Sequence, residues 1–354
     1  MAAAKRLLAI AICVLIPPVL VTCAPPWIPD FAAWPLDTEG YDIEELRWPL
    51  SASYARGTDV YLGLQTGEIL RVDDRDLSVP AVSLGRPLET GPRLLFVSRA
   101  GVVFVSADGR PMHRSGDDGQ TWQVCLDVPV WRMDEDDDGS LYAGNYTKDA
   151  RHVATLYKST DGGRSWTEVF RHEANHHIHT VRWDERAKRL YIAYGDGPTR
   201  GQAYSDDRGA TFQILAQGPD QGHTDVAFTD DYVLWASDDQ SGRLSGSPDT
   251  RGAAETLLGW SQFMWFAVAD GPQVYIGTVT SSRFGGERAA LLASSDQGNT
   301  WQKVLETALS HGPYAQGWYA ESREASAGGW LYCTGGDESG PKSYRVRRLP
   351  PAGD

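Results

Sequence analysis

Seven of the eight histidines lie in segments that are expected to form loops and strand starts. His177 and His179 lie two residues apart at the start of an expected β-strand, so their side chains project to the same face. His223 opens a later expected strand. Imidazoles titrate near neutral pH, so these three histidines, together with Tyr194, are candidate catalytic acids and bases. Converging imidazoles would instead bind a divalent metal ion, or the rings simply hydrogen-bond loop carbonyls. No other cofactor is expected.

Arginine is the second residue type concentrated in the expected loops. A guanidinium presents forked donors to a carboxylate, so these arginines favour an acidic sugar such as a uronate or a sialate as the ligand. Surface ion pairing with neighbouring Asp and Glu is the alternative. Two loop tryptophans complete the candidate set. The expected substrate-binding residues are Arg151, Arg200, Arg283, Arg288, Trp265 and Trp318.

An acidic run from Asp134 to Gly139 has the alternating spacing of the first three ligands of a calcium loop. The twelfth position counted from Asp134 is Asn145, where such a loop has a bidentate glutamate. A turn between two strands explains the Asp-Gly pair equally well, and both interpretations stay open.

The elements that position these residues are indicated by a repeated motif, Ser-x-Asp-x-Gly-x-Thr/Ser-Trp/Phe. Its aromatic residue occurs at Trp122, Trp166, Phe212 and Trp301, in steps of 44, 46 and 89 residues, and a decayed copy is expected within 245–252. The Asp carboxylate accepts backbone N–H groups across a hairpin turn, and Gly takes the positive φ that closes the turn. Four aspartates are therefore expected to be structural: Asp117, Asp161, Asp207 and Asp296.

Strand patterns fall in register with this motif. One run opens each period, as in 179–183 and 224–228, and a second follows a turn, as in 141–144, 190–193, 274–277 and 331–334. About four strands in roughly 43 residues make one blade of a β-propeller. The sequence thus predicts an all-β propeller of four-stranded blades over residues 51–350, with seven blades and with six or eight as alternatives.

The motif and its spacing resemble the Asp-box (BNR) repeat of the sialidase-like β-propeller superfamily over roughly residues 50–345. The resemblance implies that the boxes lie opposite the functional face. That face would be made by the loops leading into the innermost strands and by the loops joining the second strands to the third. Sialidase activity is disfavoured, because the early Arg-Ile-Pro signature is absent; the nearest stretch is Arg47-Trp48-Pro49-Leu50.

The N-terminus is typical of an export signal. Lys5 and Arg6 precede an apolar stretch that is interrupted by prolines and too short to favour a membrane span. Residues 1–23 are expected to be a signal peptide of lipoprotein type, with Cys23 acylated; cleavage after Ala24 and an uncleaved anchor are the alternatives. Residues 24–50 are a candidate for a strand that closes the ring. We expect an exported protein, either lipid-anchored in the cell envelope or periplasm, or secreted.

The formal net charge of −14 argues against nucleic acid as a partner, because no basic surface would offset phosphate repulsion. Contact with the membrane is expected only through the N-terminal lipid, and we expect a monomer. Export would allow a disulfide between Cys125 and Cys333, although two separate core thiols are the expectation.

Two functional hypotheses follow. The first is a carbohydrate-active or glycan-binding propeller acting on an acidic glycan at its His- and Arg-bearing face; an enzyme of this kind would be a glycoside hydrolase or a polysaccharide lyase. The second is a non-catalytic propeller that serves as a receptor or an assembly scaffold for a protein partner. Convergence of the His and Arg side chains around one deep pocket would favour catalysis.

Overall fold

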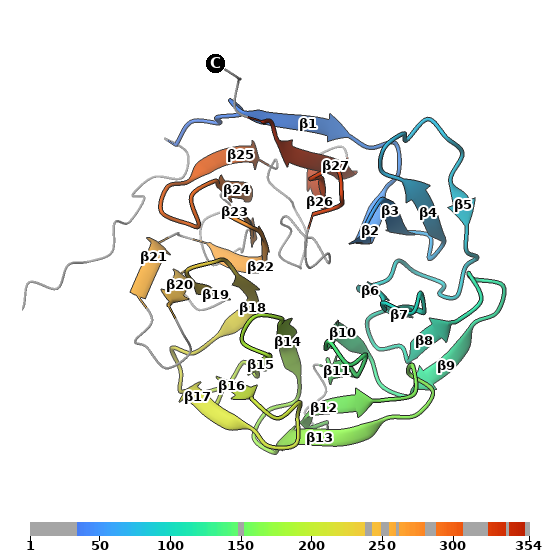
Figure 1. Ribbon diagram of the computed structural model, residues 1–354, viewed down its shortest axis with the longest axis vertical. Helices are drawn as coiled ribbons and strands as arrows, with labels where there is room; N and C mark the ends of the chain where they lie inside the picture. Colours follow the sequence, from blue (N-terminus) through green and yellow to red (C-terminus); the bar gives the residue numbers. More distant parts are fainter. Residues whose placement is uncertain are drawn as a thin grey trace, which may run out of the picture.

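The chain forms a seven-bladed, all-β propeller around a central axis (Figure 1). The computed structural model describes residues 34–147, 152–237, 243–248, 255–259, 262–279, 288–306, 325–337 and 340–350. Within these ranges the chain forms strands, turns and loops, and no helix of the length and apolar character needed to cross a membrane occurs. The predicted fold and the predicted blade count are confirmed.

Six blades are four-stranded antiparallel sheets whose strands follow one another in chain order from the axis outward. Blade 1 comprises β2 (Leu50–Arg56), β3 (Asp59–Leu64), β4 (Ile69–Asp73) and β5 (Val82–Ser83). Blade 2 comprises β6 (Leu94–Val97), β7 (Val103–Ser106), β8 (Met112–Ser115) and β9 (Gln123–Leu126). Blade 3 comprises β10 (Val130–Glu135), β11 (Leu141–Asn145), β12 (Ala154–Ser159) and β13 (Thr167–His172).

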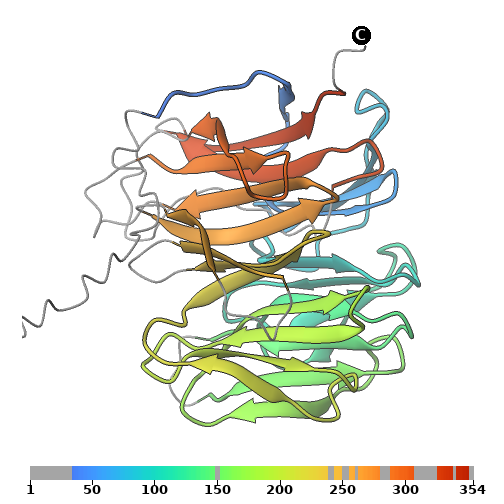
Figure 2. The same ribbon diagram turned by 60° about the vertical axis from the view of Figure 1, so that its left-hand side comes forward.

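The next three blades repeat this order (Figure 2). Blade 4 comprises β14 (Ile178–Asp184), β15 (Arg189–Tyr194), β16 (Gly201–Ser205) and β17 (Gln213–Gln217). Blade 5 comprises β18 (His223–Phe228), β19 (Val233–Ser237), β20 (Arg243–Ser247) and β21 (Glu255–Gly259). Blade 6 comprises β22 (Phe263–Asp270), β23 (Gln273–Val279), β24 (Ala290–Ser294) and β25 (Gln302–Glu306).

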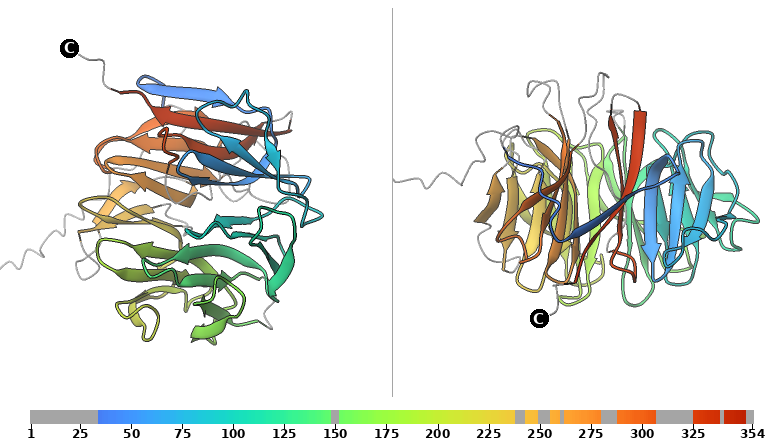
Figure 3. Two further views of the ribbon diagram at one scale, coloured as in Figure 1. Left: turned by 45° about the vertical axis from the view of Figure 1, so that its right-hand side comes forward. Right: turned by 90° about the horizontal axis from the view of Figure 1, so that it is seen from above.

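Blade 7 combines strands from the N-terminal and C-terminal parts of the described chain. Its described strands are β26 (Leu331–Asp337), β27 (Gly340–Arg348) and β1 (Tyr41–Glu45), in the order β1-β27-β26. The N-terminal β1 runs antiparallel along the outer side of β27, in a register that pairs Tyr41 with Arg348 and Glu45 with Tyr344. Figure 3 shows β1 crossing the edge of the disc to reach this position. A strand from the N-terminal segment therefore closes the ring.

Strand order fixes which parts of the chain meet on each face of the disc. The inner strands β2, β6, β10, β14, β18 and β22 run along the axis in the same direction, because each blade repeats the same strand order. We call the side where they begin the loop face; it also carries the loops between the second and third strands. The opposite side carries the ends of the inner strands and the turns between the third and fourth strands. Because the repeated motif occupies those turns, we call it the box face.

The four motif turns share one hydrogen-bonding pattern, which the turn at Asp207 illustrates. The Asp207 carboxylate accepts the Thr211 N–H at 2.8 Å and the Thr211 hydroxyl at 2.6 Å, as well as the Ser205 hydroxyl at 2.8 Å. Gly209, at φ +84°, donates its N–H to the Ser205 hydroxyl at 2.7 Å. The same set recurs around Asp117, Asp161 and Asp296. Each carboxylate closes its own turn on the box face.

Buried carboxylates tie the inner strands of blades 3 to 6 together. Asp225 on β18 pairs with Arg182 on β14 through two contacts, Nε–Oδ1 at 3.1 Å and Nη2–Oδ2 at 3.0 Å. Asp225 also accepts the backbone N–H of Ala267 on β22 at 3.2 Å. Asp134 on β10 accepts the backbone N–H of Trp183 on β14 at 2.8 Å. These side chains supply hydrogen bonds between sheets whose backbones pair only within their own blade.

The acidic run of blade 3 forms the turn between β10 and β11. Asp136 Oδ1 accepts the backbone N–H groups of Asp138 and Ser140 at 3.0 and 2.9 Å, and Oδ2 accepts the Tyr142 hydroxyl at 2.8 Å. Gly139 takes φ +82° to complete the turn. The turn interpretation therefore accounts for these residues.

The two cysteines of the described chain lie in different blades. Cys125 is half-buried on β9, Cys333 is buried on β26, and both are free thiols. The expectation of two separate thiols is confirmed.

Candidate functional site

Two histidines meet where the chain enters the inner strand of blade 4, on the loop face. A bulge between Ile178 and Thr180 interrupts the pairing of β14 with β15 at this point. The rings of His177 and His179 approach each other so that their Nε2 atoms lie 3.0 Å apart. The expectation that these two side chains project together agrees with this geometry.

Asp196 brings a carboxylate to the same point from the loop between β15 and β16. Its Oδ1 accepts the His179 Nε2–H at 2.8 Å, and its Oδ2 lies 3.3 Å from His177 Nε2. The preceding Gly195 has φ +78°, and a Cβ there would lie 1.9 Å from Asn175 Oδ1. Only glycine fits, so the backbone at this position is set to turn Asp196 back toward the histidines.

Aromatic rings support the histidine pair from blade 3. Tyr146 stacks on the ring of His177, with 4.4 Å between ring centroids and 25° between planes. Trp131 stacks in turn on Tyr146 at 3.4 Å and 7°. The Nδ1–H of His177 donates to the carbonyl oxygen of Thr147 at 2.8 Å. The stack and the hydrogen bond together fix the plane of the His177 ring and its tautomer.

Burial sets the charges in this cluster, which we call the His-His-Asp cluster (His177, His179 and Asp196). Burial lowers the pKa of His177, and its contact with Asp196 offsets that effect only in part. Burial alone would raise the pKa of Asp196, but the contacts with His177 and His179 outweigh it and hold this pKa well below its usual range. At neutral pH the cluster therefore combines a neutral His177 with an ionised carboxylate.

The cluster is open to solvent on one side only. The His177 side chain is fully buried and that of His179 is 6 % exposed, whereas the Asp196 side chain is 52 % exposed. Two imidazoles and a carboxylate with one accessible side can exchange protons with a ligand or hold a metal ion.

His223, the third histidine of the predicted site, lies between blades 4 and 5 and is not part of the His-His-Asp cluster. Its Nδ1 is 2.5 Å from Gln202 Nε2, and its ring meets Trp235 edge-on at 5.6 Å. It lines a pocket of about 350 Å³, which we call the inter-blade pocket. The other lining residues are Gln202, Leu215, Ala216, Asp220, Gln221, Trp235, Arg243, Ser245, Ser247 and Thr256.

Tyr194 points to a different neighbourhood from the histidine pair. Its ring lies 4.7 Å from that of His172 and 5.4 Å from that of Phe170, at the junction with blade 3. Among the described residues its hydroxyl is buried and finds no hydrogen-bond partner, and burial raises its pKa. A phenol in this setting resists ionisation.

The predicted arginines that lie within the described residues form hydrogen bonds or ion pairs with other groups of the protein. The Arg200 guanidinium donates to the carbonyl oxygen of Pro219, and Arg288 pairs with Glu306 at 3.0 Å. Trp265 is half-buried on β22. Four further predicted residues lie outside the described residues: Cys23, Arg151, Arg283 and Trp318.

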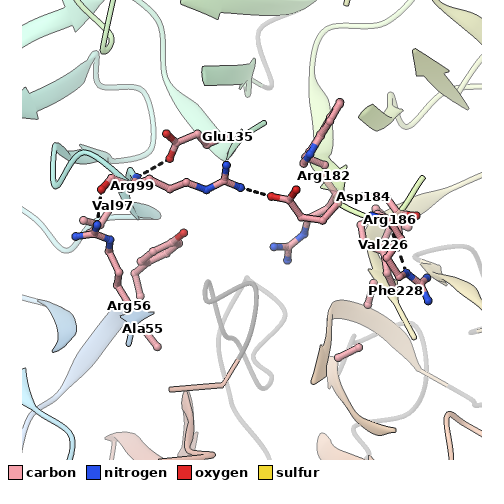
Figure 4. A pocket seen from close by; sticks show the side chains of 15 residues that line it. Ala55, Arg56, Val97, Arg99, Glu135, Arg182, Asp184, Arg186, Val226 and Phe228 are labelled. Atoms are coloured by element: carbon pink, nitrogen blue, oxygen red, sulfur yellow. Dashed lines mark hydrogen bonds and ion pairs between the residues drawn. The ribbon is translucent and has the colours of Figure 1, made fainter. Parts of the chain in front are cut away.

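A pocket of about 300 Å³ occupies the mouth of the central channel on the box face (Figure 4). Its lining combines apolar residues, among them Val97 and Val226, with charged side chains. The guanidinium of Arg99 pairs with Glu185, and the Arg99 N–H donates to Glu135 at 2.6 Å (Figure 4). Sequence reasoning did not single out this channel-mouth pocket. A recurring charge at or just after the end of an inner strand, as at Arg56, Arg99 and Glu135, is the signal that indicates it.

Sequence reasoning also did not select Asp196, Tyr146 or Trp131 as site residues. Asp196 follows a glycine directly after the second strand of its blade, as Tyr146 follows β11. Both thus belong to loops between second and third strands, which were predicted to build the functional face. The sequence predicted the loops in which these two residues lie, but it did not predict their contacts with the histidine pair.

The sequence matches no described protein family and no curated protein. Among solved structures, the fold is similar to the GH74 xyloglucanase from Xanthomonas campestris (16% identity, TM-score 0.54, 75% of this chain and 47% of that one). It is also similar to YCF48 bound to D1 peptide (13% identity, TM-score 0.57, 90% and 99%). The third comparison is with the RRP9 WD40 repeats (12% identity, TM-score 0.57, 87% and 97%).

These similarities establish the propeller fold and leave the ligand open. The chain spans about half the length of the xyloglucanase and nearly the whole of the other two chains. The structures with which it shares the fold thus include a glycan-degrading enzyme and a peptide-bound propeller.

Proposed function

We propose that this chain is an exported, glycan-binding β-propeller of the Asp-box type, which holds a sugar in the inter-blade pocket between blades 4 and 5. The chemistry of that pocket is the observation that carries the proposal. The four turns with one shared hydrogen-bonding pattern support the Asp-box assignment. The N-terminal sequence pattern supports export, with anchoring through an acylated Cys23.

The inter-blade pocket offers the groups that a sugar requires. Amide and hydroxyl side chains both donate and accept hydrogen bonds, as the hydroxyls of a sugar do. Gln221, Ser245 and Thr256 supply such groups, and Trp235 adds an aromatic surface for the apolar face of a sugar ring. A volume of about 350 Å³ suits a small ligand unit. The pocket is thus polar and partly aromatic, with Asp220 and Arg243 as charged lining residues.

Arg243 bears on whether the glycan is acidic. It lines the pocket, and its Nη2 donates to the carbonyl oxygen of Asp220 at 3.2 Å. A guanidinium at this position offers a forked donor to a sugar carboxylate. We therefore extend the proposal to acidic glycans, with Arg243 in the role that the sequence suggested for Arg200 and Arg288.

Binding of the mature protein to a panel of neutral and uronate-containing oligosaccharides, measured by calorimetry, tests the proposal. Gln221→Ala is expected to weaken binding about 5- to 100-fold, since a ligand hydroxyl would lose its partner in the pocket. Arg243→Gln is expected to weaken binding of the uronates alone. Gln123→Ala, an exposed glutamine on β9, is the matched control and leaves affinity unchanged. Equal binding by wild type and Gln221→Ala would refute this site.

A second candidate function, docking of a protein segment, is favoured by the channel-mouth pocket. Arg99, Glu185 and Arg186 are each about half exposed there, and apolar residues also line the pocket. A peptide with an apolar centre and flanking charges of both signs would fit this arrangement. Retention of displayed peptides by wild type, and its loss in an Arg99→Glu/Arg186→Glu variant, would support docking. Retention of the peptides by both proteins would rule out docking at the channel-mouth pocket.

A further inference from the structure

We propose that His177, His179 and Asp196 bind a divalent first-row transition-metal ion on the loop face of blade 4. The proposal concerns the His-His-Asp cluster, which is distinct from the inter-blade pocket, and it does not depend on the identity of the glycan. It differs from the histidine trio that the sequence suggested, because Asp196 takes the place of His223.

The donor atoms already have the spacing of a coordination site. The three contacts are 3.0 Å between the two Nε2 atoms, 2.8 Å from His179 Nε2 to Asp196 Oδ1, and 3.3 Å from His177 Nε2 to Asp196 Oδ2. Ligands held at about 2.1 Å from an ion and at right angles to each other lie about 3.0 Å apart. The three groups can therefore meet one ion without rearrangement of the backbone.

The hydrogen bonds around the cluster orient its nitrogen donors. Because a carbonyl oxygen can only accept, the contact with Thr147 places the proton of a neutral His177 on Nδ1. Its Nε2 lone pair then faces Asp196 and the Nε2 of His179. The His179 Nε2–H thus faces two acceptors, the Asp196 carboxylate and the His177 Nε2. A cation bound here would take the place of this proton, which moves to Nδ1 of His179, and would contact both Nε2 lone pairs and the carboxylate at once.

The surroundings hold the ligands as outer-shell groups do in known metal sites. A metal-bound histidine usually donates its other ring N–H to a carbonyl or a carboxylate, as His177 does to Thr147. The stacked Tyr146 fixes the ring plane, and Gly195 fixes the turn that directs Asp196 inward. These contacts come from blades 3 and 4, so the site depends on the packing of two blades.

The donor set selects the kind of ion. Two imidazoles and one carboxylate suit Zn²⁺, Co²⁺, Ni²⁺ or Fe²⁺, whereas Ca²⁺ and Mg²⁺ require mostly oxygen ligands. Since Asp196 is half exposed, water or a ligand oxygen can reach the remaining coordination positions. Such an open site is the arrangement that binds or activates a further ligand, in contrast to a closed structural site.

The test is titration of the mature, tag-free protein with Zn²⁺ and with Co²⁺ after dialysis against a chelator. We expect one Zn²⁺ per chain by calorimetry, and a visible Co²⁺ absorption spectrum that Zn²⁺ abolishes by displacement. His179→Ala and Asp196→Asn are expected to weaken the affinity by at least about tenfold. His223→Ala removes a histidine that is not part of the cluster and is the matched control, with unchanged affinity.

The variants also separate a lost ligand from a lost fold. Asp196→Asn keeps the shape of a half-exposed side chain, so its far-ultraviolet circular dichroism and melting temperature should match those of the wild type. Absence of a 1:1 complex in the wild type, or equal affinity in a folded Asp196→Asn variant, would overturn the proposal. Neither result would affect the glycan proposal, whose variants lie in the other pocket.

Discussion

The buried pair of Arg182 and Asp225 offers the sharpest test of what holds the inner strands together. Both side chains are almost fully buried, at 5 % and 0 % exposure, and their two hydrogen bonds measure 3.0 and 3.1 Å. Burial alone would raise the pKa of Asp225, but the charge of Arg182 holds it below its usual value. Asp225→Asn removes this charge while it keeps the size of the side chain and one acceptor oxygen.

The expected cost is large because the arginine stays behind. Loss of one partner from a buried ion pair leaves an uncompensated charge and costs about 3–5 kcal/mol. With a urea m-value of about 3 kcal/mol per M, the unfolding midpoint would fall by about 1–1.7 M. The amide also presents an N–H₂ where Asp225 now accepts from Arg182 and Ala267, so the loss should lie in the upper part of this range.

Urea unfolding followed by tryptophan fluorescence measures the effect, with a surface pair as the control. Asp118 pairs with Arg71 across blades 1 and 2 at 3.2 Å, but its side chain is 61 % exposed. Asp118→Asn makes the same chemical change there and is expected to cost less than about 1 kcal/mol. Arg182→Met combined with Asp225→Asn should recover part of the loss. Equal effects of Asp225→Asn and Asp118→Asn would show that burial of the charge is not what matters.

Three further outcomes follow from the turns, the cluster and the ring closure. The hydroxyl of Thr211 lowers the pKa of Asp207 to about 2, so the ionised carboxylate stabilises the fold fully above the unfolded-state pKa of about 3.9, and this stabilisation disappears as pH falls through 2. Thermal melts from pH 7 to 2 should therefore show Asp207→Asn less stable than wild type at pH 7 and equally stable at the acid end. A difference in melting temperature that stays constant with pH would contradict this. Gly195→Ala forces a Cβ against Asn175 at positive φ, and urea unfolding should show a loss of more than about 1 kcal/mol, whereas unchanged stability would mean that the turn can relax. A chain that begins after Glu45 lacks β1 and should melt at a lower temperature in calorimetry; an unchanged melting temperature would show that β27 needs no partner on that edge.

The fold was predictable because each copy of the repeated motif contains the residues that form its own turn. Each motif carries its turn in a few adjacent residues, as the contacts from Asp207 to Ser205 and Thr211 show, so the hairpin is encoded locally. Four copies at a regular period then fix the size of the blade. Alternating apolar residues before and after each turn were sufficient to place the strands within a few residues.

The site was harder to predict because its contacts run between loops and blades. His177 and His179 are neighbours in sequence, and their meeting follows from strand geometry. Asp196 reaches them through a glycine turn, and Tyr146 reaches them from another blade, so neither contact has a signature at short spacing. His223 was grouped with the pair because it starts an equivalent strand. The ring of His223 lies beside Gln202 instead, across the junction of blades 4 and 5.

Ring closure by β1 has a consequence for the order in which the molecule can assemble. Tyr41 pairs with Arg348, so the contact spans nearly the whole chain and its closure carries an entropic cost of about 5 kcal/mol. Synthesis delivers β1 first and β27 last, and in the interval β1 is an unpaired edge strand that can add to another chain. Until β27 is synthesised, six blades can fold while blade 7 stays incomplete. During that interval, pairing of β1 with another molecule competes with ring closure inside the same molecule.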